Sequence, residues 1–421
     1  MVGLWLLAPE HLRLGTWDLL TQWAGPSPSE LSTRLALQLV HEAALGVVHL
    51  RTARCLSQKG FEVLNGLPFV ASDQSIHDLL SAHTVQQSES LQLVLGCLRR
   101  ARGHFQGRLL AIDPHRMPSA SKRQMPRYRD NGAIKPYKVS TGFFCLDVET
   151  HQPICFLFGS SSMTVSQVTP RLLQISAAIL NPSDQSRPLV LADAEHCTQE
   201  ILQSVPANTP FDLLVPMSNT KSLTANLNSI PPKDFQPHWA GWATTRRPFH
   251  FTHSPEISYC QLIQRSGENL QDFYYKAFLA TRYRDDVLDL AINYPQRWHV
   301  EEFFNAYQDL GWKRAGTMNL NIRFGQMSMA LIAQTVCDQF RKRLGDPYSG
   351  WDSRHFASAF FRGIDGDIRV ANDTILVTLY NAPKTDLLKS HYENLPKILE
   401  RENVNPRVPW LFDYKLDFRF R

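Results

Sequence analysis

The segment 109–113 reads Leu-Leu-Ala-Ile-Asp, a short apolar run that ends in an acid. Its pattern predicts a buried strand, and we expect Pro114 to end the strand pairing. The segment 188–193, Pro-Leu-Val-Leu-Ala-Asp, repeats the arrangement. A carboxylate at the end of a buried strand is costly unless a cation meets it. Asp113 and Asp193 are therefore candidate site residues, and helix capping is the structural alternative for each.

The elements around these two strands predict the fold class. Val, Phe and Thr are frequent in 138–148 and 153–158, which predicts an antiparallel hairpin after the first strand. Residues 164–181 and about 195–205 indicate helices, and 211–215 indicates another strand. The order β-β-β-α-β-α-β, with acids after the first and fourth strands, is a ribonuclease H-like α/β layout.

Three domains are predicted along the chain. Residues 1–105 are expected to form a helical domain, either a DNA-binding helix-turn-helix or a plain helical bundle. The catalytic core spans 106–345 and is interrupted by a mainly β insertion at about 216–281, which is rich in Pro, Asn, Trp and Thr. Residues 346–421 predict a small C-terminal α+β region, with a strand at 374–380 and a helix at about 385–401, that provides dimer or DNA contacts.

Composition restricts the class of protein. The 421 residues are 43% hydrophobic and 20% charged, as in a globular protein, and the net charge of +5 permits a polyanionic partner without requiring one. The seven cysteines form no Cys-x2-Cys pair, so we expect a reduced protein without a zinc knuckle. The apolar start lacks a basic flank and no apolar run reaches about 20 residues, so neither a signal peptide nor a membrane span is expected.

A third candidate acid lies in the segment 294–304, Tyr-Pro-Gln-Arg-Trp-His-Val-Glu-Glu-Phe-Phe. Arg297 and Glu301 are four residues apart and would share one helix face. Pro295 indicates that Tyr294 precedes the helix proper. Alone, this pattern is also that of a surface ion pair. Together with Asp113 and Asp193 it predicts three carboxylates on adjacent elements.

Such a set of carboxylates suits Mg²⁺ or Mn²⁺. Two ions about 3.5–4 Å apart can promote phosphoryl transfer, and Asp113 is our choice for the bridging ligand. Basic residues cluster around Asp113 within 99–138, among them Arg116, Lys122 and Arg123. This cluster predicts contacts to a phosphate backbone, with a solvated loop as the alternative.

Three motifs carry a family resemblance. Ile-Asp-Pro-His-Arg at 112–116, Leu-Ala-Asp-Ala-Glu-His at 191–196 and Tyr-x2-Arg-x3-Glu at 294–301 resemble the acidic motifs of DDE transposases of bacterial insertion sequences. The last resembles the subgroup with Tyr-x2-Arg-x3-Glu-x6-Lys. The resemblance covers roughly 108–345 and implies that Asp113, Asp193 and Glu301 are the catalytic, metal-binding acids. Glu302 is offset from Glu301 by about 100° on the helix.

The resemblance also implies the DNA contacts. Tyr294 and Arg297 match residues that hold terminal DNA phosphates, and Trp298 is a candidate for stacking on an unpaired base. The family's lysine falls at position 308, which is Gln308 here. Lys313 replaces it only if the helix ends or bends near Gly311.

The implied protein is a transposase that binds the ends of its insertion sequence and catalyses metal-dependent DNA cleavage and strand transfer. Its partners would be double-stranded DNA, as terminal inverted repeats and target, and a second copy in a synaptic homodimer. It would be cytoplasmic and nucleoid-associated, in a bacterium or archaeon. The alternatives are a catalytically inactive or domesticated DNA-binding relic and another ribonuclease H-like nuclease such as a junction resolvase. The DNA ends, the target preference and the cleavage route, hairpin or other, are open.

Overall fold

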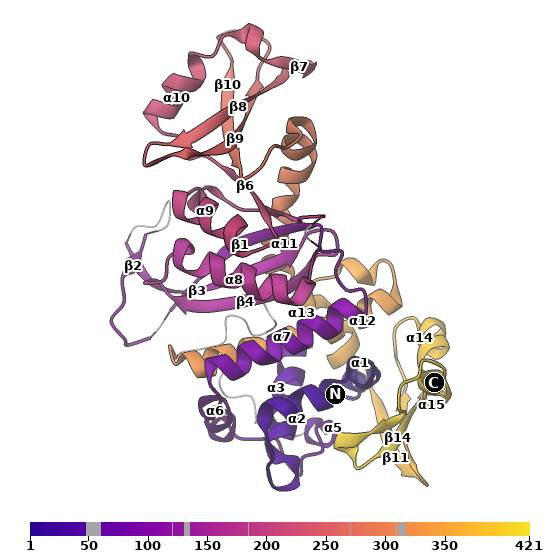
Figure 1. Cartoon of the computed structure of the whole chain (residues 1–421). Coiled ribbons are helices and arrows are strands. Elements are labelled where there is room, and N and C mark those ends of the chain that lie inside the picture. Colours follow the sequence, from indigo (N-terminus) through magenta and orange to yellow (C-terminus); the bar gives the residue numbers. More distant parts are fainter. Residues whose placement is uncertain are drawn as a thin grey trace. The chain divides into compact units, whose positions relative to one another are not determined.

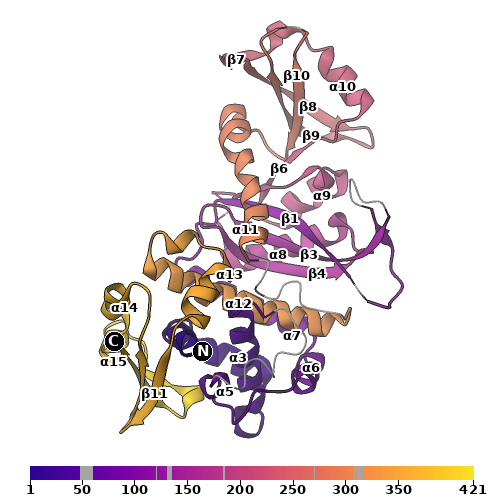
Figure 2. The same ribbon diagram turned by 180° about the vertical axis from the view of Figure 1, so that it is seen from behind.

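The computed structural model describes residues 1–47, 60–119, 121–129, 135–183, 185–269, 271–307, 310 and 317–421. The described residues pack into two compact units. Figures 1 and 2 show the chain from two opposite sides, coloured by residue number. Unit 1 contains Met1–Leu98, Ser119–Arg123 and Phe304–Arg421, and unit 2 contains Arg99–Pro118 and Gln124–Phe303. The domain boundaries expected at 105 and 345 stay predictions.

Unit 2 is built on one mixed sheet flanked by helices, so the chain is a mixed α/β protein (Figure 1). The strand order is β2-β3-β1-β5-β6-β10-β9-β8-β7, with β4 paired to β3. β3 runs antiparallel to β1 and β4, whereas β5 runs parallel to β1 and β6. The strands are β1 (Leu109–Pro118), β2 (Arg127–Tyr128), β3 (Tyr137–Asp147), β4 (Gln152–Ser160), β5 (Leu189–Leu191), β6 (Asp212–Pro216), β7 (Gln236–Trp239), β8 (Trp242–Phe251), β9 (Ser254–Ser266) and β10 (Tyr274–Ala280).

The first strand is longer than predicted. β1 does not end at Pro114, which pairs with Phe143, but continues to Pro118. The pairing with β5 stops at Ala111, so beyond that residue β1 has a partner on one side only. A proline is tolerated there because one row of N–H groups no longer needs an acceptor. Asp113 therefore lies within the strand, just past its contact with β5.

Helices cover both faces of this sheet. α8 (Val165–Leu180) packs on β3, β4 and α9 (Gln199–Asn208), where Cys155 of β4 lies 3.2 Å from Ser176 of α8. Cys145 of β3 pairs with Cys155, so the two cysteines share the face that α8 covers. Side chains alternate along a strand, so the neighbouring Phe144 points to the other face of the sheet. There Phe144 meets Phe303 of α11 (His299–Tyr307), with ring centroids 5.8 Å apart.

Tyr294 precedes α11, as Pro295 indicated, but the segment that contains it is itself helical. A π-helical turn η6 (Leu288–Asn293) leads into the 3-10 helix η7 (Tyr294–Trp298), and Tyr294 has right-handed helical angles. Pro295 occupies the first turn of η7, where a missing N–H group is harmless. η7 contacts β1, which brings its side chains to the sheet.

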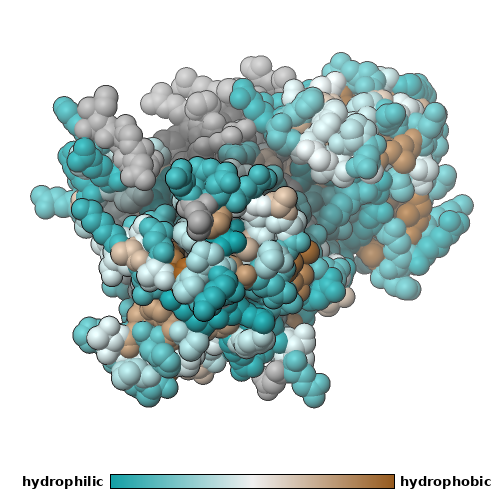
Figure 3. Space-filling model, turned by 90° about the horizontal axis from the view of Figure 1, so that it is seen from above, coloured by the Kyte–Doolittle hydropathy of each residue, from teal (hydrophilic) through white to brown (hydrophobic). Residues whose placement is uncertain are grey.

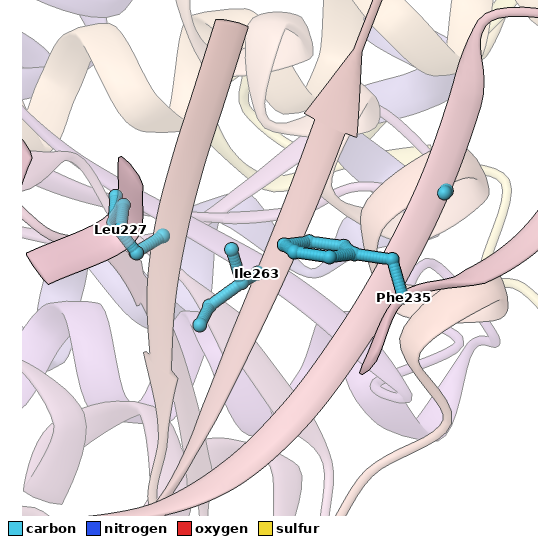
Figure 4. Close-up of a cluster of buried hydrophobic side chains, with 5 residues drawn as sticks. Leu227, Phe235 and Ile263 are labelled. Atoms are coloured by element: carbon cyan, nitrogen blue, oxygen red, sulfur yellow. The ribbon is translucent and has the colours of Figure 1, made fainter. Parts of the chain in front are cut away.

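The insertion extends the same sheet, because β10 pairs antiparallel with β6. Its strands β7 to β10 pack against a helix that the sequence did not predict, α10 (Lys221–Asn228), which Thr220 caps, and η5 (Pro232–Asp234) follows. Leu227, Phe235 and Ile263 form its small core with two alanines (Figure 4). The insertion is therefore an extended arm of the sheet with its own apolar cluster.

In unit 1 the long helix α12 (Leu320–Leu344) packs against α1, α3 and α6. The predicted helix at 385–401 is interrupted, because Asn394 adopts left-handed angles with φ of 60° and Pro396 lies in the first turn of the next helix.

The smaller sheet has the order β11-β12-β14-β13. The other elements of unit 1 are η1 (Val2–Leu7), α1 (Ala8–Leu14), α2 (Thr16–Ala24), η2 (Pro28–Glu30), α3 (Leu31–Ala44), α5 (Phe61–Leu64), α6 (Asp73–Ala82), α7 (Val85–Ala101, whose last turn belongs to unit 2), η8 (Tyr348–Gly350), α13 (Ser353–Phe356), η9 (Ala357–Arg362), β11 (Gly366–Ala371), β12 (Thr374–Leu379), α14 (Thr385–Tyr392), α15 (Leu395–Arg401), β13 (Arg407–Val408), η10 (Pro409–Leu411) and β14 (Tyr414–Phe420).

The surface gives no sign of a membrane-spanning segment in the described residues. None of their helices combines the length and the apolar character needed to cross a membrane. On the face drawn in Figure 3, outside the grey residues, hydrophobic areas are small and separated by hydrophilic ones.

Candidate active site

The parallel register of β1 and β5 brings the two aspartates into one row. Ala111 pairs with Leu191, and Asp113 and Asp193 each follow two residues later. Paired strands lie about 4.8 Å apart, so acids in matching positions are close neighbours. The charge of Asp193 is in fact one of the influences on the ionisation of Asp113. The two apolar runs found in the sequence therefore bring their acids to the same edge of the sheet.

Arg297 links the third acid to this row. Its Nη1 lies 3.5 Å from Oδ1 of Asp113, and its Nη2 donates to Oε1 of Glu301 at 2.9 Å. The side chain of Arg297 is 15% exposed, so the two ion pairs are largely shielded from solvent. Glu302 instead lies 4.0 Å from His299 and is half exposed. Of the two neighbouring glutamates, Glu301 is the one directed at the aspartates.

Asp113 is poorly neutralised despite this arginine. Burial, together with the charges of Asp193 and Glu301, raises its pKa from 3.8 to about 8, while Arg297 and Arg116 act in the opposite direction. Burial is the largest of these influences, and a carboxylate that has lost most of its hydration gains from further positive charge. The surroundings of Asp113 thus favour the arrival of a cation.

Asp193 is held differently. Its Oδ1 accepts hydrogen bonds from the backbone N–H of Glu195 at 3.1 Å and from Nδ1 of His196 at 2.6 Å, so it caps the short 3-10 helix η4 (Ala194–His196). Burial raises the pKa of Asp193, but the bonds and charge of His196 and the charge of Arg297 outweigh burial, and the net pKa is lowered. The capping alternative is therefore realised, and Asp193 stays an anion beside Asp113.

Tyr294 packs beside the row of acids. Its ring meets that of Phe278 at 4.7 Å, and its hydroxyl donates to the carbonyl of Ala192 at 3.4 Å. Burial raises the pKa of Tyr294 to about 12, so it is a neutral hydrogen-bond donor. Lys276 of β10 lies over the same two rings, with Nζ 5.3 Å from the Tyr294 centroid.

Lys276 is a candidate residue that the sequence did not reveal. Burial and the charge of Arg297 lower its pKa, and no ion pair joins it to a carboxylate among the described residues. Two strand pairings place Lys276 at the acidic edge. β6 is parallel to β5, so both strands end at this edge, and the pairing of Phe278 with Pro216 brings β10 to the end of β6. A lone lysine in a strand pattern could not indicate this position before those pairings were known.

The other predicted DNA contacts are only partly brought to the acids. Arg116 of β1 forms an ion pair with Glu195, a second residue absent from the predictions, and stacks over Tyr128 at 4.5 Å. Trp298 is 57% exposed and open to a stacking partner. Lys122 and Arg123 are exposed but belong to unit 1. Gln308, Gly311 and Lys313 lie outside the described residues.

A metal ion would need a small rearrangement here. In the part of the chain that the structure describes, no three His, Cys, Asp or Glu side chains converge closely enough to hold an ion. Arg297 fills the space between Asp113 and Glu301. The donor set of three carboxylates nevertheless has the chemistry that Mg²⁺ and Mn²⁺ prefer, and burial, the main cause of the raised pKa of Asp113, makes its charged form costly without a cation beside it.

Comparison with known proteins identifies the family. Residues 104–336, more than half of the chain, match the model of the transposase DDE domain. The chain therefore belongs to this transposase family. A cryo-EM structure of a piggyBac transposase synaptic complex with hairpin DNA is similar over 85% of this chain and 79% of that chain, with a TM-score of 0.44 and 10% sequence identity. No curated protein matches the chain.

Proposed function

We propose that this transposase cuts DNA at the ends of an insertion sequence and joins those ends to a target, as a ribonuclease H-like enzyme of the subgroup with the Tyr-x2-Arg-x3-Glu motif. The observation that carries the proposal is the row formed by Asp113 and Asp193, to which Arg297 links Glu301. This row lies within the part of the chain that matches the family.

Asp113, Asp193 and Glu301 would hold Mg²⁺ or Mn²⁺, in the form of two ions. When bound, these ions supply a Lewis acid for the attacking water or 3′-hydroxyl and for the leaving oxygen. Arg297 has to turn away from Asp113 for this, and its guanidinium is then free to bind a phosphate. We therefore assign Arg297 two states, one paired with the acids and one paired with DNA.

The DNA contacts would come from the residues next to the acids. Tyr294 and Arg297 donate to phosphate oxygens, and Lys276 adds a compact positive charge that has no acidic partner among the described residues. Trp298 would stack on an unpaired base. Arg116, Lys122 and Arg123 would contact the backbone further along, as the basic cluster around Asp113 suggests.

The remaining parts of the proposal concern assembly. The substrate would be double-stranded DNA with terminal inverted repeats, and two copies would hold two ends in a synaptic complex. The helical residues 1–105 would bind the ends, and residues 346–421 would make dimer or DNA contacts. The host would be a bacterium or archaeon, with the protein in the nucleoid-containing cytoplasm.

One observation favours a second candidate, an inactive DNA-binding relic. Arg297 lies within ion-pair distance of two of the three acids, and no ready metal centre exists among the described side chains. In that case the site would be a closed ion-pair network. The motif's lysine is also replaced by Gln308, which removes one expected phosphate contact.

The test is to incubate the protein and Mg²⁺ with a supercoiled plasmid carrying the DNA that flanks its gene. A transposase releases 3′ ends and joins them to new sites, and both events require the metal. Binding of the ends without nicking would overturn the proposal in favour of the relic. Nicking without any joining would overturn it in favour of a nuclease such as a junction resolvase.

A further inference from the structure

The smaller sheet of unit 1 has an open edge at β11. This strand pairs antiparallel with β12, and no strand of the described residues pairs with its other side (Figure 1). The C-terminal half of β11 is accessible to solvent, since Arg369 is exposed and Val370 is 60% exposed. A sheet edge of this kind is a template for a further strand from another chain.

The backbone of β11 offers hydrogen bonds to such a strand. Tyr380 donates its N–H to the carbonyl of Asp365 at 2.9 Å, so Asp365 turns its polar backbone groups toward β12. The direction of these groups alternates along an antiparallel strand, and those of Ile368 and Val370 therefore point away from β12. An incoming strand can bond to them without disturbing the existing sheet.

The side chains of β11 carry opposite charges two residues apart. Asp367 and Arg369 share one face of the strand, where Nη2 of Arg369 lies 3.3 Å from Oδ2 of Asp367. The side chain of Arg369 is 73% exposed, so this ion pair contributes little to the stability of a single copy. A hydrogen bond from Tyr380 and the nearby arginine lower the pKa of Asp367. Asp367 is therefore an anion at neutral pH and can bind a second arginine.

These charges select one register for a second copy of β11. In an antiparallel pair with its two-fold axis at Ile368, each Asp367 faces Arg369 of the other copy, and the two Ile368 side chains face each other. An axis at residue 366, 367 or 369 would bring like charges face to face, which is destabilising. An axis between two residues would set outward-pointing backbone groups against inward-pointing ones. β11 is therefore complementary to itself in the register centred on Ile368.

The apolar face of β11 fits the same register. Val370 would face Gly366 of the second copy, which has no side chain to obstruct it. Val2 lies beside Gly366, with its Cγ1 3.2 Å from the place that a Cβ would take. The exposed Val370 would therefore be covered by an aliphatic neighbour, and its apolar surface would leave water.

We propose that two copies of this protein associate by antiparallel pairing of their β11 strands about a two-fold axis at Ile368. Each copy uses this edge once, so the assembly closes as a dimer. The inference deepens the proposed function, because it names the surface through which two copies would hold two DNA ends, and it rests on that function for this role alone.

The first test is analytical ultracentrifugation of the full chain without DNA, over a range of micromolar concentrations. Arg369→Asp places an acid opposite Asp367 in both cross-strand pairs and should weaken dimerisation at least about tenfold. Adding Asp367→Arg restores opposite charges and should return the Kd to within about threefold of the wild type. The matched control is Arg419→Asp, at an exposed arginine of β14 in the same sheet, which should leave the Kd unchanged.

The second test locates the axis by disulfide formation. Ile368→Cys places two cysteines opposite each other with Cα atoms about 5.5 Å apart, which is within the range of a disulfide. Val370→Cys is the matched control, because this position is well exposed but its two copies would lie about 13 Å apart along the strands. We expect mild oxidation to cross-link the first variant and not the second.

Three results would overturn the proposal: a protein that is monomeric at every concentration, dimerisation that Arg369→Asp leaves unchanged, or equal cross-linking of the two cysteine variants. The first of these would leave the edge to a strand of a different protein. Failure of the proposed function gives another result, in which the dimer forms and responds to the charge swap but plasmid DNA is never nicked.

Discussion

Asp113 lies within β1 and Asp193 follows the paired strand β5, each two residues beyond the last pair of the two strands, yet their surroundings differ. Asp113 is largely buried near two acids and two arginines, and burial is the main reason that its pKa is raised to about 8. Asp193 has a backbone N–H group and His196 to satisfy it, and its pKa is lowered. One acid is thus short of positive charge, while the other is a stable anion.

Under the proposed function, this difference would let one site bind a metal and still fold without it. Asp193 keeps its charge and its position through η4, so it would be a preformed ligand. Asp113 can take up a proton when no cation is present, which limits the repulsion within the row. The folded state therefore tolerates three adjacent carboxylates in both conditions.

Removing the charge of each aspartate in turn should have the largest effect on stability. A raised pKa means that Asp113 favours folding below pH 3.8 and that this contribution is lost as the pH rises through about 8. Asp113→Asn should therefore be more stable than the wild type at pH 9 in EDTA, by on the order of a few kcal/mol. The difference should vanish near pH 4, as followed by thermal unfolding.

Asp193→Asn should have the opposite sign. The lowered pKa of Asp193 contributes stability above its ordinary pKa, and this contribution is lost as the pH falls through the folded value. The variant should melt below the wild type at pH 9 and approach it in acid. If both substitutions destabilise the protein equally at pH 9, the contrast between the two acids is wrong.

A smaller effect is expected from His196, which positions Asp193 through the 2.6 Å hydrogen bond. His196→Ala should raise the pKa of Asp193, so the pH at which acid removes this carboxylate's contribution to thermal stability should move up by about one unit. His196→Asn keeps an N–H donor and should restore part of the shift. A pH profile that stays in place while overall stability falls would mean that His196 has only a packing role.

The smallest effect is expected on DNA binding, from substitution of Lys276, which lies on the insertion side of Asp113 and Asp193. Lys276→Gln should weaken DNA binding about fivefold and lower the salt slope by about 0.9, the value for one phosphate contact. Lys221→Gln, an exposed lysine of the same insertion, should leave the slope unchanged. Equal slopes for all three proteins would remove Lys276 from the DNA-binding residues.

Local pattern was enough to find the acids and most of the elements that carry them. The apolar runs before Asp113 and Asp193 and the four-residue spacing of Arg297 and Glu301 depend only on strand alternation and helix periodicity. The segments that became β3, β4, α8 and β6 were predicted from the same signals.

The features that could not be predicted from the sequence depend on how the strands and helices pair in the folded protein. β1 could run past Pro114 because β5 is so short, and no local rule contains that fact. Lys276 reached the acidic edge through the register of β10 on β6. Arg297 was predicted to bind phosphate, with an ion pair to Glu301 as the alternative; its second pair, with Asp113, became visible only when the strand and the helix were brought together.

The central claim is that Asp113, Asp193 and Glu301 together cut DNA with a divalent metal. The most direct measurement is plasmid nicking in Mg²⁺ by Asp113→Asn, Asp193→Asn and Glu301→Gln, with Glu302→Gln as the matched control on the same helix turn. We predict that nicking falls by at least about 10³-fold in the first three proteins, since several kcal/mol of metal stabilisation are lost, while binding of the ends and the control are preserved. Wild-type nicking by Asp193→Asn, or equal losses in Glu301→Gln and Glu302→Gln, would contradict the account.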